Sequence, residues 1–416
     1  MQLIDNRYLL SGELDPLDLV NQYDCPLYVY DSAIIKRQYE RITSAFNVKR
    51  LRINYACKAN TNLSIMRLLR AWGSGLDTVS IQEVQLGLRA GYQPHDIIYT
   101  PNCVSMEEIA EAVETGVRIN IDNISVLEQF GHLFPDTPVC IRINPHIMAG
   151  GNSKISVGHI DSKFGISIHQ MPHVLKVVEA LKLKVEGIHM HTGSDILDTE
   201  VFLQAAEILL NTAQQFHDLD YVDFGSGFKV PYKPNDISTD IEDFGRRISE
   251  RFNAFCEEYG KDLCLMFEPG KFLVSESGYL LVRVNVVKTT PATVFAGIDS
   301  GLNHLLRPML YNAYHHIVNL SHPTGKRRIY TVVGYICETD TFGINRQLTE
   351  VREGDVLCIQ NAGAYCYAMA SNYNSRFRPA EVLVHEGGHF LIRQRETMDD
   401  LLRNQVEVDV LMEEGV

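Results

Sequence analysis

The sequence predicts an α/β fold, with a parallel (β/α)8 TIM barrel and a second, antiparallel β domain. Short strand-like apolar runs alternate with longer helical patterns from about residue 50 to residue 270, as in a barrel of strand-then-helix units. After Gly270 the runs are rich in valine, isoleucine and tyrosine and are separated by turn residues, which is typical of antiparallel sheet. We therefore expect a barrel over residues 31–270, inserted between two pieces of a β domain, 1–30 and 271–416.

The barrel region contains eight strand-like runs, the number that a closed (β/α)8 barrel requires. The runs end near Lys58, Asp77, Pro101, Asp122, Asn144, His191, Gly225 and Glu268. Helical patterns lie between them at residues 65–72, 83–90, 106–115, 174–183, 201–216 and 241–259. Because chemistry in such barrels gathers at the C-terminal strand ends, the side chains at these ends are the first candidates for a site.

The second domain is predicted from short β-branched and aromatic runs on both sides of the barrel. They lie at residues 8–10, 26–30, 279–287, 328–333, 355–359 and 381–385. The first two precede the barrel in sequence, so we expect them to join the later strands in one domain.

Composition restricts the kind of ligand and the compartment. With 416 residues, 45% of them hydrophobic, the chain can build two cores. Its net charge of −14 argues against nucleic acid or an anionic membrane as a partner. Nine cysteines without a Cys-x-x-Cys pair indicate reduced thiols rather than disulfides or a metal site. Since neither a signal peptide nor a membrane-spanning run is recognisable, we expect a cytoplasmic protein with a small-molecule ligand.

Lys58 lies at the end of the first strand run, in Ile-Asn-Tyr-Ala-Cys-Lys-Ala-Asn, just before a helical pattern that starts near Asn62. An amine at this position can anchor a carbonyl cofactor as a Schiff base. Most strand-end lysines are merely solvated charges, so this motif alone does not decide between the two.

Glycine-rich loops follow the seventh and eighth runs, as Asp223-Phe-Gly-Ser-Gly-Phe-Lys and Glu268-Pro-Gly-Lys. Glycines let backbone N–H groups approach an anion, and in barrels the loops after these two strands recurrently bind phosphate. One Gly-x-Gly is usually only a turn, but two such loops together with Lys58 favour a phosphate-bearing cofactor.

The sixth run ends in His189-Met-His191-Thr-Gly-Ser194. Two histidines in alternation on a strand can simply be packed or exposed, and a metal would need a third ligand that spacing does not reveal. Alternatively, a histidine could stack on a planar cofactor while Ser194 donates to its phosphate.

Taken together, these strings resemble the fold-type III pyridoxal-phosphate-dependent decarboxylases, and among them most closely those that act on diaminopimelate. The resemblance runs from the Lys58 motif to Ser371-Asn-Tyr-Asn-Ser-Arg-Phe-Arg-Pro-Ala-Glu-Val-Leu-Val. It implies the alanine racemase/decarboxylase-like fold. The most specific strings are Arg307-Pro-Met-Leu-Tyr311-Asn-Ala-Tyr-His, Cys337-Glu338-Thr-Asp340 and Gly363-Ala-Tyr365.

The resemblance implies pyridoxal 5'-phosphate as the cofactor, bound covalently by Lys58, with His191 stacked on its ring. The carboxylate of Glu268 would keep the ring nitrogen protonated, so that the ring can accept electrons. Cofactor contacts are further expected from Asp77, Ser194, Gly227, Gly270 and Tyr365.

The resemblance also implies the reaction, which is decarboxylation of meso-2,6-diaminopimelate to L-lysine and CO2, the last step of lysine biosynthesis. Cys337 would protonate the substrate carbon from a neighbouring subunit, which predicts a homodimer with its active site at the subunit interface. Substrate binding is expected from Arg307, Tyr311, Glu338, Tyr365 and, with less weight, Lys271. Without the resemblance, Cys337 reads as an ordinary buried thiol, Arg307 as an ion-pair partner and Tyr365 as a core aromatic.

The chain departs from the family pattern at two positions. Lys271 stands where the family has an arginine, and lysine lacks the planar fork that binds a carboxylate with two hydrogen bonds. Ser226 replaces the third glycine of the loop after the seventh strand, but glycines remain on both sides of it.

Three other functions fit parts of the pattern. A decarboxylase of ornithine, lysine, arginine or carboxynorspermidine would share both domains. An alanine-racemase-like enzyme would need two bases on opposite faces of the cofactor. A non-catalytic pyridoxal-phosphate-binding protein would resemble the barrel alone.

Overall fold

The structure, a computed structural model, describes residues 1–147, 162–193 and 197–408. The chain forms two compact units, which we call the barrel domain and the β domain. The barrel domain comprises Ser32–Ser277 and Gly363–Ala368, and the β domain comprises Met1–Asp31, Gly278–Ala362 and Met369–Val416. Residues 271–277 and 363–368, assigned to the β domain from sequence, thus group with the barrel. No helix of the described residues has the length and apolarity to cross a membrane.

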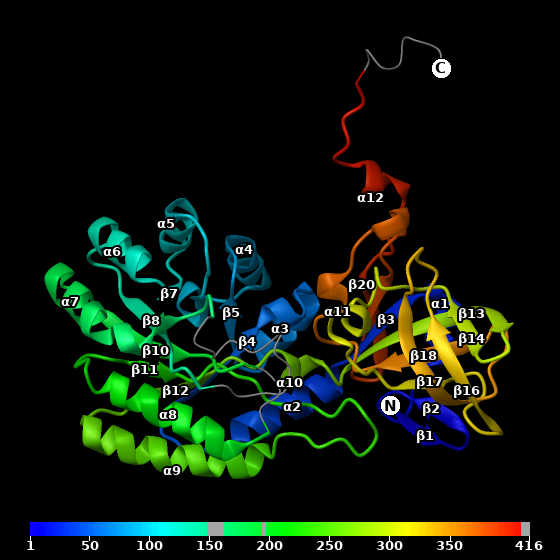
Figure 1. The fold of residues 1–416 in the computed structure, drawn as a ribbon, viewed down its shortest axis with the longest axis horizontal. Helices are drawn as coiled ribbons and strands as arrows, with labels where there is room; N and C mark the ends of the chain where they lie inside the picture. The colour runs from blue at the N-terminus through cyan, green and yellow to red at the C-terminus, as the bar shows by residue number, and fades with distance from the viewer. Residues whose placement is uncertain (148–161, 194–196, 409–416) are drawn as a thin grey trace. The chain divides into compact units, whose positions relative to one another are not determined.

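The barrel is a ring of eight parallel strands, as predicted (Figure 1). Each strand pairs with the next, β10 pairs with β8, and β12 pairs with β4, which closes the ring. The short strand β9 (Ile166–Ser167) is added to β8. The ring strands are β4 (Leu51–Ala56), β5 (Gly75–Thr78), β6 (Ile97–Tyr99), β7 (Arg118–Ile121), β8 (Val139–Asn144), β10 (Val185–Met190), β11 (Tyr221–Asp223) and β12 (Cys264–Phe267).

Helices follow the strands and surround the ring (Figure 1). Their starts obey ordinary capping chemistry, since the hydroxyls of Ser80 and Ser105 accept from the backbone N–H groups of Glu83 and Glu108. The helices are α2 (Ser32–Ala45), α3 (Leu63–Ala71), α4 (Ile81–Ala90), α5 (Met106–Thr115), α6 (Ile124–Leu133), α7 (Met171–Leu181), α8 (Thr199–Ala213), α9 (Ile241–Tyr259) and the short α10 (Lys271–Val274). Of these, α2, α6 and α10 were not identified from sequence.

A cluster of phenylalanines fixes the last two strands against their helices. Phe267 of β12 stacks on Phe224, which follows β11, with ring centroids 5.8 Å apart. Phe202 of α8 and Phe244 of α9 meet edge to face at 4.8 Å and both contact Phe267. Because these rings are buried, the cluster holds the β11 and β12 ends in place through dense aromatic packing.

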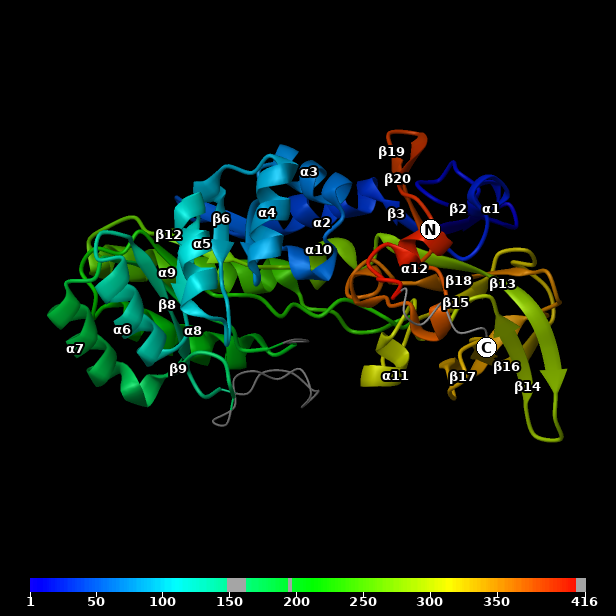
Figure 2. The same cartoon turned by 90° about the horizontal axis from the view of Figure 1, so that it is seen from above.

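The β domain contains a nine-stranded sheet, in which β13 and β14 form a long hairpin (Figure 2). Most pairs are antiparallel, but β19 pairs with β3 and β14 with β16 in parallel. The sheet is therefore mixed rather than wholly antiparallel as expected, because these partners are not joined by a tight turn that would fix their direction. The elements are β1 (Gln2–Ile4), β2 (Arg7–Leu9), α1 (Pro16–Tyr23), β3 (Leu27–Asp31), β13 (Gly278–Thr289), β14 (Val294–Ile298), α11 (Arg307–Tyr311), β15 (Ile317–Asn319), β16 (Arg327–Val333), β17 (Thr341–Thr349), β18 (Val356–Gln360), β19 (Ala380–His385), β20 (Gly388–Arg393) and α12 (Met398–Leu402).

Candidate active site

One pocket of the barrel domain gathers most of the cofactor residues predicted from sequence. They reach it from four strand ends and from the 363–368 segment, where the backbone N–H of Tyr365 donates to the carbonyl of Ala59 at 2.8 Å. The pocket is lined by Lys58, His191, Gly227, Glu268, Gly270, Lys271 and Tyr365, together with Ala56, Ser226, Phe228 and Phe272. Ser194 lies outside the described residues.

Lys58 lies in the 3-10 turn Cys57–Ala59 that follows β4. Its Nζ is 3.9 Å from Oδ2 of Asp77, which is 2% exposed at the end of β5. Burial of the amine lowers the pKa of Lys58. The negative groups near it, of which Asp77 has the largest effect, raise the pKa by more than burial lowers it, so the net shift is upward. In the cofactor-free protein Lys58 is therefore an ammonium that faces carboxylates.

The pKa values of the three buried carboxyls of the site are shifted in different directions. Burial and the charge of Glu268 raise the pKa of Asp77, and Lys58 offsets only part of this rise. Burial raises the pKa of Asp223 as well, with Glu268 again the next cause. Burial alone would raise the pKa of Glu268 too, but His189 and Lys58 lower it to about 2. Glu268 is thus the one of the three whose surroundings favour the ionised form.

The loop after β11 has a backbone that requires glycine. Gly225 has φ 62° and Gly227 has φ 145°, values that residues other than glycine rarely adopt. A Cβ at Gly225 would lie 2.5 Å from the carbonyl oxygen of Met190. The tight turn lets the N–H of Ser226 donate to Nδ1 of His191 at 3.2 Å. This bond fixes the ring of His191 with its proton on Nε2, and burial keeps its pKa well below the usual range.

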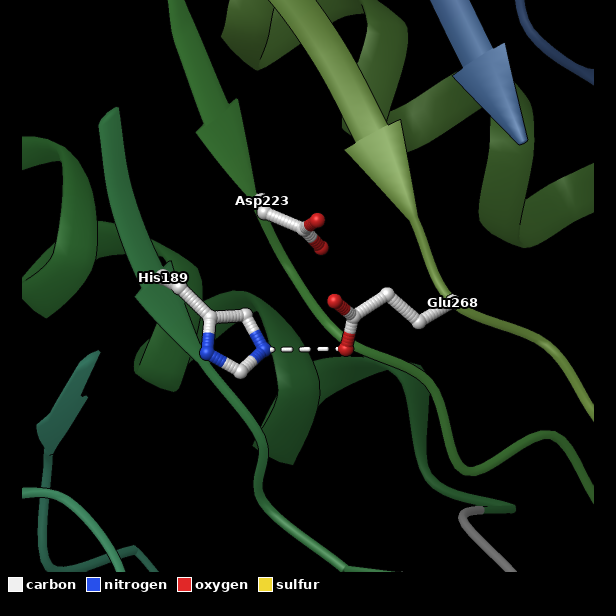
Figure 3. Close-up of side chains that lie close together, drawn as sticks. All are labelled: His189, Asp223 and Glu268. Atoms are coloured by element: carbon white, nitrogen blue, oxygen red, sulfur yellow. Dashed lines mark hydrogen bonds and ion pairs between the residues drawn. The ribbon is translucent and has the colours of Figure 1, made fainter. Parts of the chain in front are cut away.

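Glu268 is hydrogen-bonded to a histidine that sequence reasoning left without a role. His189 Nε2 lies 3.1 Å from Oε2 of Glu268 (Figure 3). His189 Nδ1 is in turn 3.0 Å from the side-chain nitrogen of Asn120 on β7. Asp223 Oδ1 accepts from the N–H of Gly225 at 2.8 Å.

His189, Asp223 and Glu268 are spaced closely enough to hold a metal, since one ligand atom of each lies within 4.8 Å of the others (Figure 3). Both ring nitrogens of His189 are, however, already engaged, one by Asn120 and one by Glu268. A metal-bound histidine keeps one ring nitrogen for the ion, so this arrangement fits a hydrogen-bonded pair better than a metal centre.

The barrel pocket fits pyridoxal phosphate by three features. Lys58, one of the residues that line the pocket, supplies an amine. In the Gly225 to Gly227 turn, Gly225 leaves no room for a Cβ and both glycines have positive φ, which suits a loop whose backbone N–H groups approach a phosphate. Glu268 is 8% exposed, and its Oε1 has no hydrogen-bond partner among the described residues, which suits an acceptor for a protonated ring nitrogen.

The predicted residues of the β domain form two groups. In the first, Arg307 begins α11 and its guanidinium lies 5.8 Å from the ring centre of Tyr311, at the end of the same helix. In the second, Cys337 and Glu338 are exposed neighbours in the loop between β16 and β17. Cys337 is therefore not the buried strand thiol of the simpler interpretation.

A short network holds the Cys337 loop. Asp340 has φ 42° and accepts from the N–H groups of Leu302 at 2.6 Å and Ile336 at 2.9 Å. Tyr373 donates its hydroxyl to Glu338 at 2.8 Å. The hydrogen bond to Glu338, and then that to Cys337, raise the pKa of Tyr373 to about 12, so Tyr373 stays a donor.

Sequence reasoning missed several side chains that complete these groups. Asn120 and Arg142 carry no motif of their own, although both are buried polar residues in barrel strands. The guanidinium of Arg142 lies 5.1 Å from the ring centre of Phe164, and burial lowers its pKa. Tyr373 and Asn374 lie inside the Ser371 string quoted above, but nothing in that string indicates that they contact Cys337.

Comparison with known proteins identifies the family. The family "Pyridoxal-dependent decarboxylase, pyridoxal binding domain" matches residues 32–275. Diaminopimelate decarboxylase of Methanothermobacter thermautotrophicus is 42% identical, over 97% of this chain and 97% of its own length. That of Methanocaldococcus jannaschii is 34% identical, over 98% and 96%.

Solved structures agree with the sequence matches. The diaminopimelate decarboxylase structure from M. jannaschii has a TM-score of 0.90 at 32% identity and covers 99% of this chain and 98% of its own. The enzyme from Helicobacter pylori, solved with L-lysine, has a TM-score of 0.86 at 33% identity, with coverages of 94% and 98%. Together with the barrel pocket around Lys58 and Glu268, these matches confirm the resemblance, the fold class and the cofactor inferred from sequence. The chain therefore belongs to the diaminopimelate decarboxylases, a family of pyridoxal-phosphate-dependent carboxy-lyases.

Proposed function

We propose that the enzyme removes CO2 from the D-configured end of meso-2,6-diaminopimelate and releases L-lysine, the last step of lysine biosynthesis. The observation that carries this proposal is the barrel pocket, which is lined by both the amine of Lys58 and the ionised carboxylate of Glu268. Relatives matched over nearly their whole length are diaminopimelate decarboxylases, and two of the solved ones hold L-lysine.

The barrel residues would hold the cofactor as follows. Lys58 would anchor it through its amine, and His191, with its ring fixed by Ser226, would pack against its ring. The Gly225 to Gly227 turn, Gly270 and Tyr365 would hold its phosphate end, and Ser194, outside the described residues, would be a further phosphate ligand. Asp77 faces Lys58. Bound pyridoxal phosphate supplies an electron sink for the electrons that remain when CO2 leaves. Glu268 keeps the proton on the ring nitrogen, because its pKa lies near 2 and it carries a negative charge at neutral pH.

The β domain would supply the proton donor and the grip on the substrate. Cys337 is exposed, and its thiol would deliver a proton to the α-carbon. Arg307 and Glu338 match the carboxylate and the ammonium of the unreactive end, with Tyr311 and Tyr365 around it. Lys271 lines the barrel pocket. Its ammonium is a single point charge, whereas the arginine found in the family at this position has a planar guanidinium.

We further propose a cytoplasmic homodimer in which Cys337 and Glu338 of one subunit serve the barrel of the other. Support comes from the exposure of both side chains and from the nine free cysteines, which fit a reducing compartment. An isologous dimer would then contain two equivalent composite sites.

Decarboxylation of another basic amino acid is the second candidate, because Lys271 lacks the planar fork with which the family's arginine would bind a carboxylate. Purified enzyme with added pyridoxal phosphate should release CO2 and L-lysine from meso-diaminopimelate, and Lys58→Ala should release neither. Release from the LL-isomer at a comparable rate would contradict the assignment of the D-configured end. No release from meso-diaminopimelate, with turnover of ornithine or lysine, would replace the proposal by the second candidate.

A further inference from the structure

A buried chain of hydrogen bonds crosses the barrel interior and ends on Glu268. The side-chain nitrogen of Asn120 lies 3.3 Å from the hydroxyl of Thr100 and 3.0 Å from Nδ1 of His189. Nε2 of His189 lies 3.1 Å from Oε2 of Glu268 (Figure 3). We call Asn120 and His189 the relay pair. Each of the two is only 1% exposed, so their hydrogen bonds do not compete with bulk water.

The chemistry of the pair allows one proton arrangement. Nε2 of His189 faces a carboxylate, which can only accept, so Nε2 must carry a proton. Burial lowers the pKa of His189, although Glu268 opposes this, and the lowered pKa favours the neutral imidazole, in which Nδ1 is an acceptor. Asn120 must then present its NH2 group to Nδ1, as the structure has it. Asn120 thereby selects the tautomer of His189 that donates to Glu268.

The relay belongs to an unusual layer of the barrel. Asp77, Asn120, His189 and Glu268 come from β5, β7 and β10 and from the end of β12, which are alternate strands of the ring. Alternate strands supply the side chains of one interior layer, and such layers are normally filled by branched apolar residues. A polar layer here is costly to desolvate, which indicates a use beyond packing.

The charges around Glu268 explain why it needs a fixed donor. Asp77 and Asp223 are acidic groups near it, whereas Lys58, His189, His191 and Arg142 face it as donors or cations. These surroundings raise the pKa of Asp223 and lower that of Glu268. The bond from His189 occupies Oε2 and leaves Oε1 without a partner among the described residues.

We propose that Asn120 and His189 are positioning residues that hold Glu268 ionised and oriented, so that its Oε1 is the oxygen that accepts a hydrogen bond from the protonated ring nitrogen of the cofactor. This inference rests on the proposed function, because it gives the relay pair a role toward the cofactor. The relay pair contacts neither the substrate nor the reacting carbon. It acts only by positioning Glu268.

The tautomer can be tested without cofactor or activity. In cofactor-free protein with 15N-labelled histidine, comparison with His189→Gln identifies the signals of His189. We expect Nε2 to be protonated and Nδ1 unprotonated. Asn120→Asp replaces the donor by an acceptor and should place a proton on Nδ1. A wild-type His189 that is protonated on Nδ1 and bare on Nε2, or on both nitrogens, would overturn the inference.

The role toward Glu268 is tested on the holoenzyme with matched variants. Asn120→Leu and His189→Leu remove the relay, while His189→Gln keeps an amide that can donate to Glu268. The control is Asn54→Leu, the same change at another buried barrel asparagine, whose side-chain nitrogen contacts Met266 and not Glu268. We expect the two relay variants to lose about 10- to 100-fold in kcat with KM changed less than about threefold, and to shift the absorption of bound pyridoxal phosphate. His189→Gln should recover most of both.

The outcomes separate the relay from a structural role and from the proposed function. Equal losses in Asn54→Leu and Asn120→Leu, with unchanged cofactor spectra, would make the pair merely structural and overturn the inference. A relay variant that does not fold is replaced by Asn120→Asp, for which we expect the same spectral shift. A wild-type protein that shows the expected tautomer and spectrum but no turnover of diaminopimelate would refute the proposed substrate and leave the relay standing.

Discussion

Asn374 holds Cys337 through both ends of its side-chain amide. Its oxygen accepts from the backbone N–H of Cys337 at 3.1 Å, and its nitrogen donates to Sγ of Cys337 at 3.1 Å. Asn374 has φ 57°, a conformation that asparagine tolerates better than most residues. The backbone conformation and the two bonds together fix the direction of an otherwise exposed thiol.

Replacing Asn374 by alanine should therefore slow proton delivery by Cys337. We expect kcat to fall about tenfold, since two hydrogen bonds of ordinary strength are lost, and the solvent deuterium isotope effect on kcat to rise. Asn235→Ala is the control, because Asn235 is exposed in the barrel domain and has φ 60°. An unchanged isotope effect in Asn374→Ala would show that the grip on Cys337 does not matter for the proton step.

Lys58→Ala should abolish turnover, by roughly a thousandfold or more, while leaving the fold intact. The side chain is 41% exposed, so its loss should move Tm by only about 1–2 °C. Borohydride reduction of the wild-type holoenzyme should attach the cofactor to Lys58. Attachment to Lys271 instead would refute the anchoring role of Lys58.

Cys337→Ala and Lys58→Ala proteins, each inactive alone, should recover activity after their subunits exchange. In a mixed two-fold dimer, one of the two composite sites keeps both native residues. Recovery should approach one active site per mixed dimer, measured by CO2 release after verified exchange. Exchange without recovery would place both residues in the site of a single chain.

His304 should make the β domain sensitive to mild acid. It is buried, its Nδ1 lies 3.0 Å from Oγ of Ser300, and its Nε2 lies 2.9 Å from the carbonyl of Phe377. Burial lowers its pKa to about 4, against about 6.5 in an unfolded chain. The unfolded state therefore binds the extra proton first, and the free energy of unfolding decreases as pH falls from about 6.5 to about 4.

The measurement is the free energy of unfolding at several pH values for wild type and His304→Gln. The free energy of unfolding of wild type, relative to that of His304→Gln, should decrease by on the order of 3 kcal/mol between pH 7 and pH 4. His95→Gln, at an exposed histidine, serves as the control. Parallel pH profiles for wild type and His304→Gln would contradict the assignment.

The sequence predicts the barrel well because its signals are local. Each of the eight strand runs is apolar, and each is bounded by a turn or a helical pattern, so the strand ends that carry Lys58 and Glu268 can be located. Helix α6 was missed although Asn123 caps it through two backbone N–H groups, because its apolar residues are too many to give a clear helical period. The parallel pairing of β3 with β19 joins segments more than 300 residues apart, and no local pattern records such a contact.

The parts of the site that escaped prediction depend on tertiary contacts. Asn120 and His189 act together only because alternate strands of a closed ring point into one layer. Asn374 contacts Cys337 from a left-handed backbone conformation that the neighbouring residues in the sequence do not predict. Residues without motifs are found only when the fold brings them together.

We expect this enzyme to select a substrate whose unreactive end carries both a carboxylate and an ammonium, bound by Arg307 and Glu338. Lysine and ornithine lack the distal carboxylate that Arg307 is proposed to bind. Losing one member of such a charged pair costs on the order of 2 to 5 kcal/mol, or roughly thirtyfold to several thousandfold in kcat/KM.

The most direct test is kcat/KM for meso-diaminopimelate, L-lysine and L-ornithine, measured on the wild-type enzyme and on Arg307→Ala. We predict that wild type prefers diaminopimelate by at least roughly thirtyfold, and that Arg307→Ala narrows this gap by slowing diaminopimelate far more than lysine. Comparable wild-type values for diaminopimelate and for lysine or ornithine would contradict the account and favour a decarboxylase of basic amino acids.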